Sequence, residues 1–260
     1  HDFDELDNAN ASDAEYHNAM LIRMTKAGLQ QMGEKTGTAM LRYIEAAKMG
    51  DIGIPLENGF LNITNLKVQN MNAKFYHYPE AASKKLIWGF TGGRSTVSGK
   101  WIFINEKRTN YNDSYKILLE QAPFVEGTFH VNLYNTVANL SYSIRRSGDG
   151  FIQPYAMTCG NIHGDIKFSS LGSASFSQEY EILMDSSKVM PNYSNFICAA
   201  GKIYLSDAYD QLNKNYQRLL PLGVDKKLYL NATVVGQPDI AEDYVDVKMS
   251  GIVVGKSISS

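Results

Sequence analysis

Two long stretches of the sequence alternate apolar and polar residues, and in both the alternation changes phase partway along. The first stretch contains Leu61, Ile63, Leu66, Val68, Met71, Ala73, Phe75 and His77, and the second contains Phe129, Val131, Leu133, Leu140, Tyr142 and Ile144. Alternation with a period of two predicts a strand with one buried face. Each change of phase predicts a β-bulge, which bends the strand and increases its twist. The sequence therefore predicts long, bent strands of a strongly curved antiparallel sheet.

Two helices are predicted to flank these strands. Over residues 26–48, after a possible N-cap at Thr25, apolar or small residues recur at spacings of three and four: Leu29, Met32, Thr36, Met40, Tyr43 and Ala47. A less regular stripe predicts a second helix over about residues 198–220, formed by Ala200, Ile203, Ala208, Leu212, Tyr216 and Leu219. The fold class is therefore α+β, with two long helices separated by a meander of bent strands.

Three glycines interrupt the first predicted helix. Gly28, Gly33 and Gly37 each cost about 1 kcal/mol of helix propensity relative to alanine. We expect another part of the structure to approach the helix backbone closely at these positions. A packed sheet is the first interpretation, and an acyl chain is the second.

Shorter patterns complete the expected organisation. Residues 85–90 and 98–105 are predicted to form a hairpin around the glycine pair at 92–93, and residues 244–249 alternate as a final strand. Residues 1–19 contain six acidic residues and no Lys or Arg, which is typical of a flexible leader. The remainder, residues 20–260, is predicted to be one domain.

Composition and charge exclude several classes of protein. Hydrophobic residues make up 44% of the chain, enough for a sizeable core. The formal charge of -2 argues against a general nucleic-acid binder. The sequence contains no run of about 20 apolar residues, so it predicts no membrane-spanning helix.

Catalytic and metal-binding motifs are not found. A phosphate-binding loop requires a glycine five residues before Gly99, where Arg94 stands, and a Ser or Thr after Lys100, where Trp101 stands; the sequence also contains no G-x-S-x-G element. The five histidines do not have the spacing of metal ligands, and two cysteines cannot form a zinc ribbon. We therefore expect neither an enzyme nor a metal or cofactor site.

Possible glycosylation sites favour a secreted protein. Six N-x-[ST] sequons are present, roughly twice the number expected by chance from the composition: Asn10, Asn62, Asn112, Asn139, Asn192 and Asn231. The two cysteines, Cys159 and Cys198, are by themselves equally consistent with buried thiols and with a disulfide. We expect an extracellular localisation.

Several short segments, in order along residues 20–255, resemble the N-terminal barrel of the lipopolysaccharide-binding / bactericidal permeability-increasing protein family, which belongs to the tubular lipid-binding superfamily. The segment 23–29 (RMTKAGL) is similar to the family's step from a short strand into a long helix. Residues 98–101 (SGKW) match a segment near the barrel tip, and residues 219–221 (LLP) match the end of the second helix. Residues 244–251 (YVDVKMSG) resemble the strand that enters the sheet between two barrels, so we expect residues 240–255 to play that part.

The resemblance implies a twisted sheet wrapped around a long helix, with an apolar groove for the acyl chains of a phospholipid between them. It also implies a disulfide between Cys159 and Cys198, which stand where the family has one. The residues expected to line the groove are Leu29, Met32, Thr36, Met40, Tyr43, Leu212, Tyr216 and Leu219. Met is suited to such a groove because its flexible side chain adapts to ligands of varied length.

A basic segment is the expected contact for an anionic lipid head group. Residues 74–116 carry a net charge of +5. Lys107 and Arg108 lie where the family's tip hairpin would turn, and with Lys100 they are the candidate head-group contacts.

The sequence therefore predicts a secreted, non-enzymatic protein that binds phospholipid or a similar amphiphile, with bound lipid as its ligand. Two alternatives stay open. The first is a lipopolysaccharide-binding or antibacterial protein of innate immunity that acts on lipopolysaccharide or a membrane surface through its basic tip. The second is a protein-interaction module that pairs through an exposed edge strand.

Overall fold

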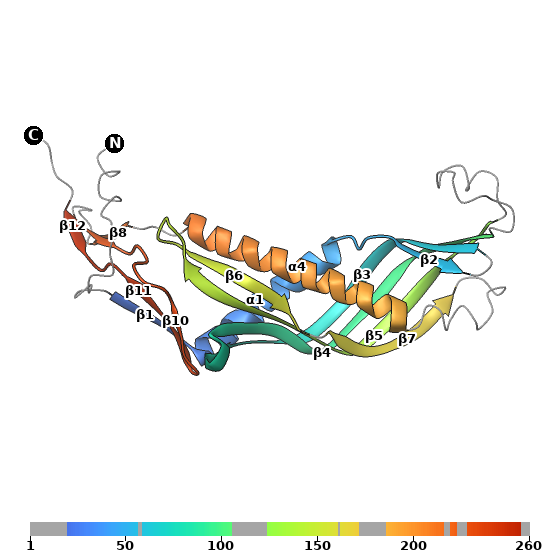
Figure 1. Ribbon diagram of the computed structural model, residues 1–260, viewed down its shortest axis with the longest axis horizontal. Helices are drawn as coiled ribbons and strands as arrows, with labels where there is room; N and C mark the ends of the chain where they lie inside the picture. Colours follow the sequence, from blue (N-terminus) through green and yellow to red (C-terminus); the bar gives the residue numbers. More distant parts are fainter. Residues whose placement is uncertain are drawn as a thin grey trace, which may run out of the picture.

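The structure is a computed structural model of the chain and describes residues 20–56, 59–105, 124–160, 162–171, 186–215, 219–222 and 228–255. The molecule is elongated, with a long curled sheet and two helices running along its length (Figure 1). None of the helices in these ranges is long and apolar enough to cross a membrane. The predicted leader, residues 1–19, lies outside the described residues.

The large sheet has six strands, and every pairing in it is antiparallel. Its strands are β2 (Ile52–Leu56), β3 (Gly59–Glu80), β4 (Lys85–Asn105), β5 (Phe124–Arg146), β6 (Ile152–Cys159) and β7 (His163–Leu171). Their order is β2-β3-β4-β5-β6, and β7 pairs with β5 as well. β6 and β7 share the outer edge of β5, because β6 pairs within residues 140–146 and β7 within residues 129–137. The predicted curved antiparallel sheet and the α+β class are confirmed.

The predicted changes of phase are bulges in the structure. The register of β3 against β4 shifts between Thr64 and Lys67 and again on both sides of Asn72. Asn65 and Asn70 lie at these shifts with φ of 54° and 53°, a left-handed conformation that asparagine adopts more readily than most residues. In β5, Asn135 has φ 51° at the corresponding break. Bends at these points let the strands curl around the helices.

The predicted hairpin at residues 85–105 is wrong, because this segment is one continuous strand, β4. Gly92, with φ 63°, and Gly93 lie at an irregularity where the register against β5 shifts. The residues on both sides of the glycines pair with the same neighbours, β3 and β5, so the chain continues in one direction. The glycine pair therefore forms a bulge and not a turn. The actual turn is the short 3₁₀ helix η2 (Ala81–Ser83) between β3 and β4.

The first helix, α1 (Lys26–Ala46), closely matches its predicted range of 26–48. Thr25 is its N-cap, and its Oγ1 accepts a hydrogen bond of 3.2 Å from the Gly28 N–H. The second helix, α4 (Ser186–Asn215), begins 12 residues before its predicted start. The added turns contain Pro191. Because proline is disfavoured in the interior of a helix, the sequence does not predict this part of α4.

Leu219 is not on the second helix, contrary to the prediction. It begins strand β8 (Leu219–Leu222) and pairs there with Asn231 of β9 (Leu228–Asn231). β9 also pairs with β12 (Val253–Gly255), which completes a three-stranded sheet. Pro221 is compatible with the edge strand β8 and not with the interior of a helix.

A second three-stranded sheet lies at the same end of the molecule (Figure 1). It consists of β1 (Met20–Thr25), β11 (Tyr244–Met249) and β10 (Asp239–Ile240), with β11 in the middle. The predicted final strand 244–249 is thus confirmed. Because β11 has partners on both sides, it does not supply the exposed edge strand that the protein-interaction alternative requires.

A disulfide joins the sheet to the second helix, as the resemblance implies. Cys159 at the end of β6 is bonded to Cys198 in α4, with the two Cα atoms 5.9 Å apart. The two cysteines are 39 residues apart in sequence. By loop entropy alone, such a link stabilises the folded chain by about 4 kcal/mol.

Candidate functional site

A groove of about 310 Å³ lies between the two helices, the large sheet and the sheet of β1 and β11. Its apolar lining residues are Ile22, Met24, Leu29, Met32, Leu86, Trp88, Ile144, Phe151, Ile152, Leu205, Ala208, Leu212, Val234, Val247 and Met249. Its polar lining residues are Thr36, His77, Tyr142, Tyr204, Tyr209 and Asn213. Within the described residues, no Lys, Arg, Asp or Glu lines it.

The periodicities of helix and strand bring these side chains together. Leu86 and Trp88 lie two residues apart on β4, so both point to the same face of the sheet. On α1, Leu29, Met32 and Thr36 follow helical spacing along one face. The second half of α4 contributes a similar stripe that begins at Tyr204. The groove is therefore walled by residues that are distant in sequence and adjacent in space.

Three polar side chains, those of His77, Tyr142 and Tyr209, lie together at the groove. The Tyr142 hydroxyl lies 2.9 Å from His77 Nε2, and the Tyr142 ring meets the Tyr209 ring edge to face, with their centroids 6.2 Å apart. Burial lowers the pKa of His77 to about 4, so its imidazole is neutral at physiological pH. Burial also raises the pKa of Tyr209 to about 12 and that of Tyr142 well above its usual range.

Two other polar groups of the lining are satisfied by backbone carbonyls. The Thr36 hydroxyl donates to the Met32 carbonyl oxygen at 2.8 Å, and the Tyr204 hydroxyl donates to the Thr36 carbonyl oxygen at 3.1 Å. The Tyr204 ring also stacks on Trp88 and contacts Tyr43. These contacts hold α1 and α4 together beside the groove.

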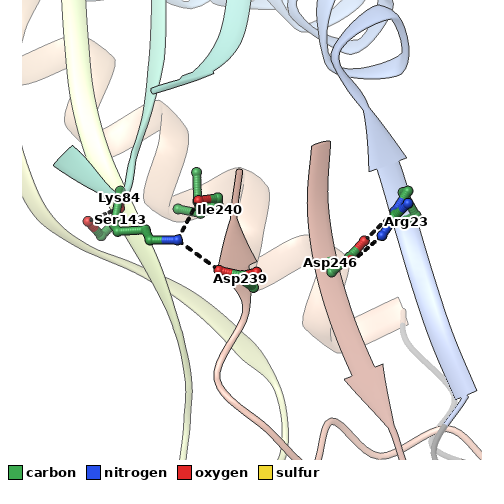
Figure 2. Close-up of polar contacts among 6 residues, drawn as sticks. All are labelled: Arg23, Lys84, Ser143, Asp239, Ile240 and Asp246. Carbon is green, nitrogen blue, oxygen red and sulfur yellow. Dashed lines mark hydrogen bonds and ion pairs between the residues drawn. The ribbon is translucent and has the colours of Figure 1, made fainter. Parts of the chain in front are cut away.

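An ion pair fixes the strands that close one side of the groove. Arg23 of β1 forms two hydrogen bonds of 2.8 Å with the Asp246 carboxylate of β11 (Figure 2). The hydrogen bonds from Arg23 lower the pKa of Asp246. The residues next to Arg23, Ile22 and Met24, line the groove. The ion pair therefore joins directly paired residues of two strands that carry lining residues.

A second contact links this small sheet to the large one. Lys84, in the turn between β3 and β4, donates from Nζ to Asp239 Oδ1 and to the Ile240 carbonyl oxygen, each at 2.9 Å (Figure 2). The Lys84 carbonyl oxygen in turn accepts a hydrogen bond of 2.9 Å from the Ser143 hydroxyl of β5. This lysine thus bridges β5 and β10 at the end of the groove.

The structure brings together only some of the residues predicted to line the groove. Leu29, Met32, Thr36 and Leu212 do line it. Met40 lies at a smaller cavity beside the disulfide, and Tyr43 packs against Tyr204. Leu219 belongs to β8, as described above, and Tyr216 lies outside the described residues.

The sheet side of the groove was not predicted residue by residue. Trp88, Tyr142 and His77 line it, although the sequence suggested only helix residues. The alternation of the strands could have identified them, because His77 and Tyr142 belong to the apolar phases of β3 and β5. The alternation does not say which part of each buried face meets a cavity and which part meets packed side chains.

The glycines of α1 are explained by sheet packing. A Cβ atom at Gly33 would lie 2.6 Å from the Cβ of His77, and one at Gly37 would lie 2.1 Å from the Phe75 ring. Both contacts are with residues of β3, of which His77 also lines the groove and Phe75 does not. A side chain at either position would therefore push α1 away from the sheet. Gly28 is different, because its nearest contact would be Thr25 Oγ1 at 3.5 Å.

The basic residues of the segment 74–116 that the structure describes are spread along the sheet. Lys100 is exposed near the C-terminal end of β4, whereas Lys84 directly precedes the other end of that strand and bonds to Asp239. Lys107 and Arg108 lie outside the described residues. Head-group contact by Lys100, Lys107 and Arg108 stays a prediction.

The predicted glycosylation sites differ in their exposure. Asn62 is buried in the sheet at 9% exposure, whereas Asn139, Asn192 and Asn231 are partly exposed. Asn10 and Asn112 lie outside the described residues. A folded chain therefore offers a glycan more room at the partly exposed sites than at Asn62.

Comparison with solved structures defines the class of the fold. The crystal structure of lipopolysaccharide binding protein superimposes with a TM-score of 0.66 at 16% sequence identity, covering 92% of this chain and 52% of that one. The chain thus spans about half the length of that protein and has the tubular lipid-binding fold predicted from its sequence. Takeout 1 of Epiphyas postvittana is also similar, with a TM-score of 0.35 and 14% identity, covering 71% of this chain and 88% of that one.

The sequence itself assigns the chain to a family. Residues 17–240 match the family described as Domain of unknown function (DUF7061), and the chain belongs to this family. No curated protein sequence matches the chain.

Proposed function

We propose that this chain is a secreted, non-enzymatic lipid-binding protein that holds the acyl chains of a phospholipid or similar amphiphile in the groove between α1, α4 and the sheet. The observation that carries the proposal is the lining of the groove, which is apolar over most of its area and uncharged among the described residues. Its volume of about 310 Å³ lies at the lower end of the range of about 300–1,000 Å³ that is typical of small-molecule sites.

The physical basis of the binding is burial of hydrocarbon. Each methylene group transferred from water into the groove contributes about 0.8 kcal/mol to the binding free energy. A charged head group stays near solvent, because no described lining residue could neutralise it inside. Lipopolysaccharide binding protein, which shares the fold, is named for a lipid ligand, and this also supports the proposal.

Two observations support an extracellular location. The disulfide between Cys159 and Cys198 is the kind of link that persists in oxidising compartments. The excess of sequons agrees with passage through a secretory route.

Native mass spectrometry of the purified protein, followed by organic extraction, tests the proposal directly. We expect an amphiphile to be bound. A groove-blocking variant then locates the site, because Ala208 of α4 lines the groove and Ala199 of the same helix is exposed outside it. Ala208→Trp should weaken binding of a fluorescent phospholipid analogue by more than tenfold, and Ala199→Trp should leave it unchanged. Equal binding by both variants, with cooperative unfolding retained, would contradict the proposed site.

A further inference from the structure

Two cavities follow one another between the helices and the large sheet. On α4, the groove is lined from within residues 204–213, and the smaller cavity of about 20 Å³ is lined from within residues 197–201. On α1, residues 29–36 contribute to the groove and Met40 lines the smaller cavity. Following α1 forward and α4 backward therefore leads from the groove to the smaller cavity.

An aromatic pair separates the two cavities. Of the described residues, Trp88 of β4 alone lines both of them, and it is 3% exposed. Its indole ring stacks on the Tyr204 ring of α4, with the centroids 5.8 Å apart and an interplanar angle of 20°. The Tyr204 hydroxyl is held in turn by the Thr36 carbonyl oxygen of α1. The pair thus connects the sheet to both helices at the boundary between the cavities.

The other end of the groove is open to solvent. Leu212 and Met32 line the groove and yet are 55% and 39% exposed, in contrast to Trp88. Leu212 lies about two turns beyond Tyr204 on α4, or about 12 Å along the helix axis. An amphiphile that keeps its head group in water therefore has its head near Leu212 and the end of its chain toward Trp88.

We propose that Trp88 closes the inner end of the groove and sets the longest acyl chain that the groove accepts. This inference rests on the proposed lipid-binding function and deepens it, because it assigns chain-length selectivity to one residue. A chain shorter than the limit buries every methylene group that is added to it. A longer chain meets the Trp88 ring and leaves its additional methylene groups in water at the open end. Without the ring, the groove and the smaller cavity join, and the limit moves to longer chains.

A series of alkylphosphocholines with octyl, decyl, dodecyl, tetradecyl and hexadecyl chains tests the proposal. Their affinities for the full chain are measured below their critical micelle concentrations, by displacement of the fluorophore N-phenyl-naphthylamine. In the unmodified protein, affinity should rise about fourfold with each methylene group up to a limiting length and then stay constant. Trp88→Ala should extend the rise by at least one member of the series, so that this member gains about tenfold or more.

Two control variants distinguish the end of the groove from its sides. Leu86→Ala truncates a buried residue of the same strand that lines the groove and not the smaller cavity, and it should keep the original limit. Gly201→Val adds a side chain at the smaller cavity, where the nearest contact of the new Cβ would be Met40 Cε at 3.5 Å. Alone, Gly201→Val should leave the series unchanged. Combined with Trp88→Ala, it should remove part of the gain.

Each result decides a separate point. An affinity that rises through the hexadecyl chain in the unmodified protein overturns the inference and leaves lipid binding standing. A limit that Trp88→Ala does not move, or that Leu86→Ala moves equally, also overturns it. Failure of every alkylphosphocholine to bind overturns the proposed function as well. If Trp88→Ala does not unfold cooperatively, Trp88→Leu replaces it, because it retains an apolar side chain at this position, and an unmoved limit in that variant overturns the inference.

Discussion

The two halves of α4 meet the sheet in different ways. In the first half, Tyr193, Ile197 and Ala200 are buried, and Cys198 is bonded to β6. In the second half, Tyr204 and the residues that follow it face the groove. The same helix therefore packs against the sheet at one end and stands apart from it at the other. The first half provides stability, and the second half leaves space that other elements must close.

The disulfide provides the strongest test of this division. Replacing both Cys159 and Cys198 with alanine should lower the free energy of unfolding by about 4 kcal/mol, because the unfolded chain regains the freedom of a long loop. Equilibrium urea denaturation measures the change. At urea concentrations below the midpoint of unfolding, the affinity of the variant for the phospholipid analogue should stay within about twofold of that of the unmodified protein. The reason is that the disulfide lies in the half of α4 that packs against the sheet. A parallel loss of binding would show that the two halves are not independent. Free thiols in the unreduced, denatured protein would contradict the bond itself.

The buried histidine beside the groove makes the stability of the fold depend on pH. The pKa of His77 is about 4 in the folded protein and near its ordinary value of 6.5 in the unfolded chain. Between these values the unfolded state binds more protons, so stability is complete above pH 6.5 and falls as the pH drops toward 4. The loss should reach about 3 kcal/mol, measured by urea denaturation across this range.

Variants separate this histidine from other titrating groups. His77→Gln should remove most of the pH dependence between 4 and 6.5. His163→Gln, which replaces an exposed histidine on β7, should retain it. An unchanged slope in His77→Gln would show that another group titrates in this window.

The contact between α1 and β3 predicts a smaller effect. Gly37→Ala should destabilise the fold by about 2 kcal/mol, because the added methyl group meets the buried Phe75 ring. Gly28→Ala in the same helix is the matched control. It should stabilise the protein by up to about 1 kcal/mol through helix propensity alone. Equal effects of the two substitutions on the melting temperature would remove the argument that close packing selects glycine at position 37.

Local patterns were sufficient to predict much of the fold. The periodicity of α1 and the bulges of β3 and β5 could be predicted because each depends on residues close together in sequence. The prediction of a hairpin at Gly92 and Gly93 is wrong because a glycine pair permits both a turn and a bulge. The pairing of the neighbouring strands decides between the two. The start of α4 was missed because Pro191 is a poor indicator of helix.

The site was harder to predict than the fold. Met32 and Met40 occupy the same stripe of α1, yet only Met32 lines the groove. Met40 lies instead at the smaller cavity beside the disulfide, and spacing along α1 contains no information about which part of α4 lies opposite each residue. The role of His77 depends on its contact with Tyr142, and only the folded sheet brings β3 and β5 close enough for it.

The pairing of β1 with β11 has a consequence for the order of events during synthesis. Met20 is the partner of Met249, so one wall of the groove joins nearly the first and the last of the described residues. On the ribosome, helix α1 and the large sheet emerge well before β11 is available. Closure of this wall is therefore a late folding step with a large loop-closure cost. Until it occurs, the nascent chain exposes the apolar interior of its groove, and a lipid or a chaperone can reach that surface before the native strand does.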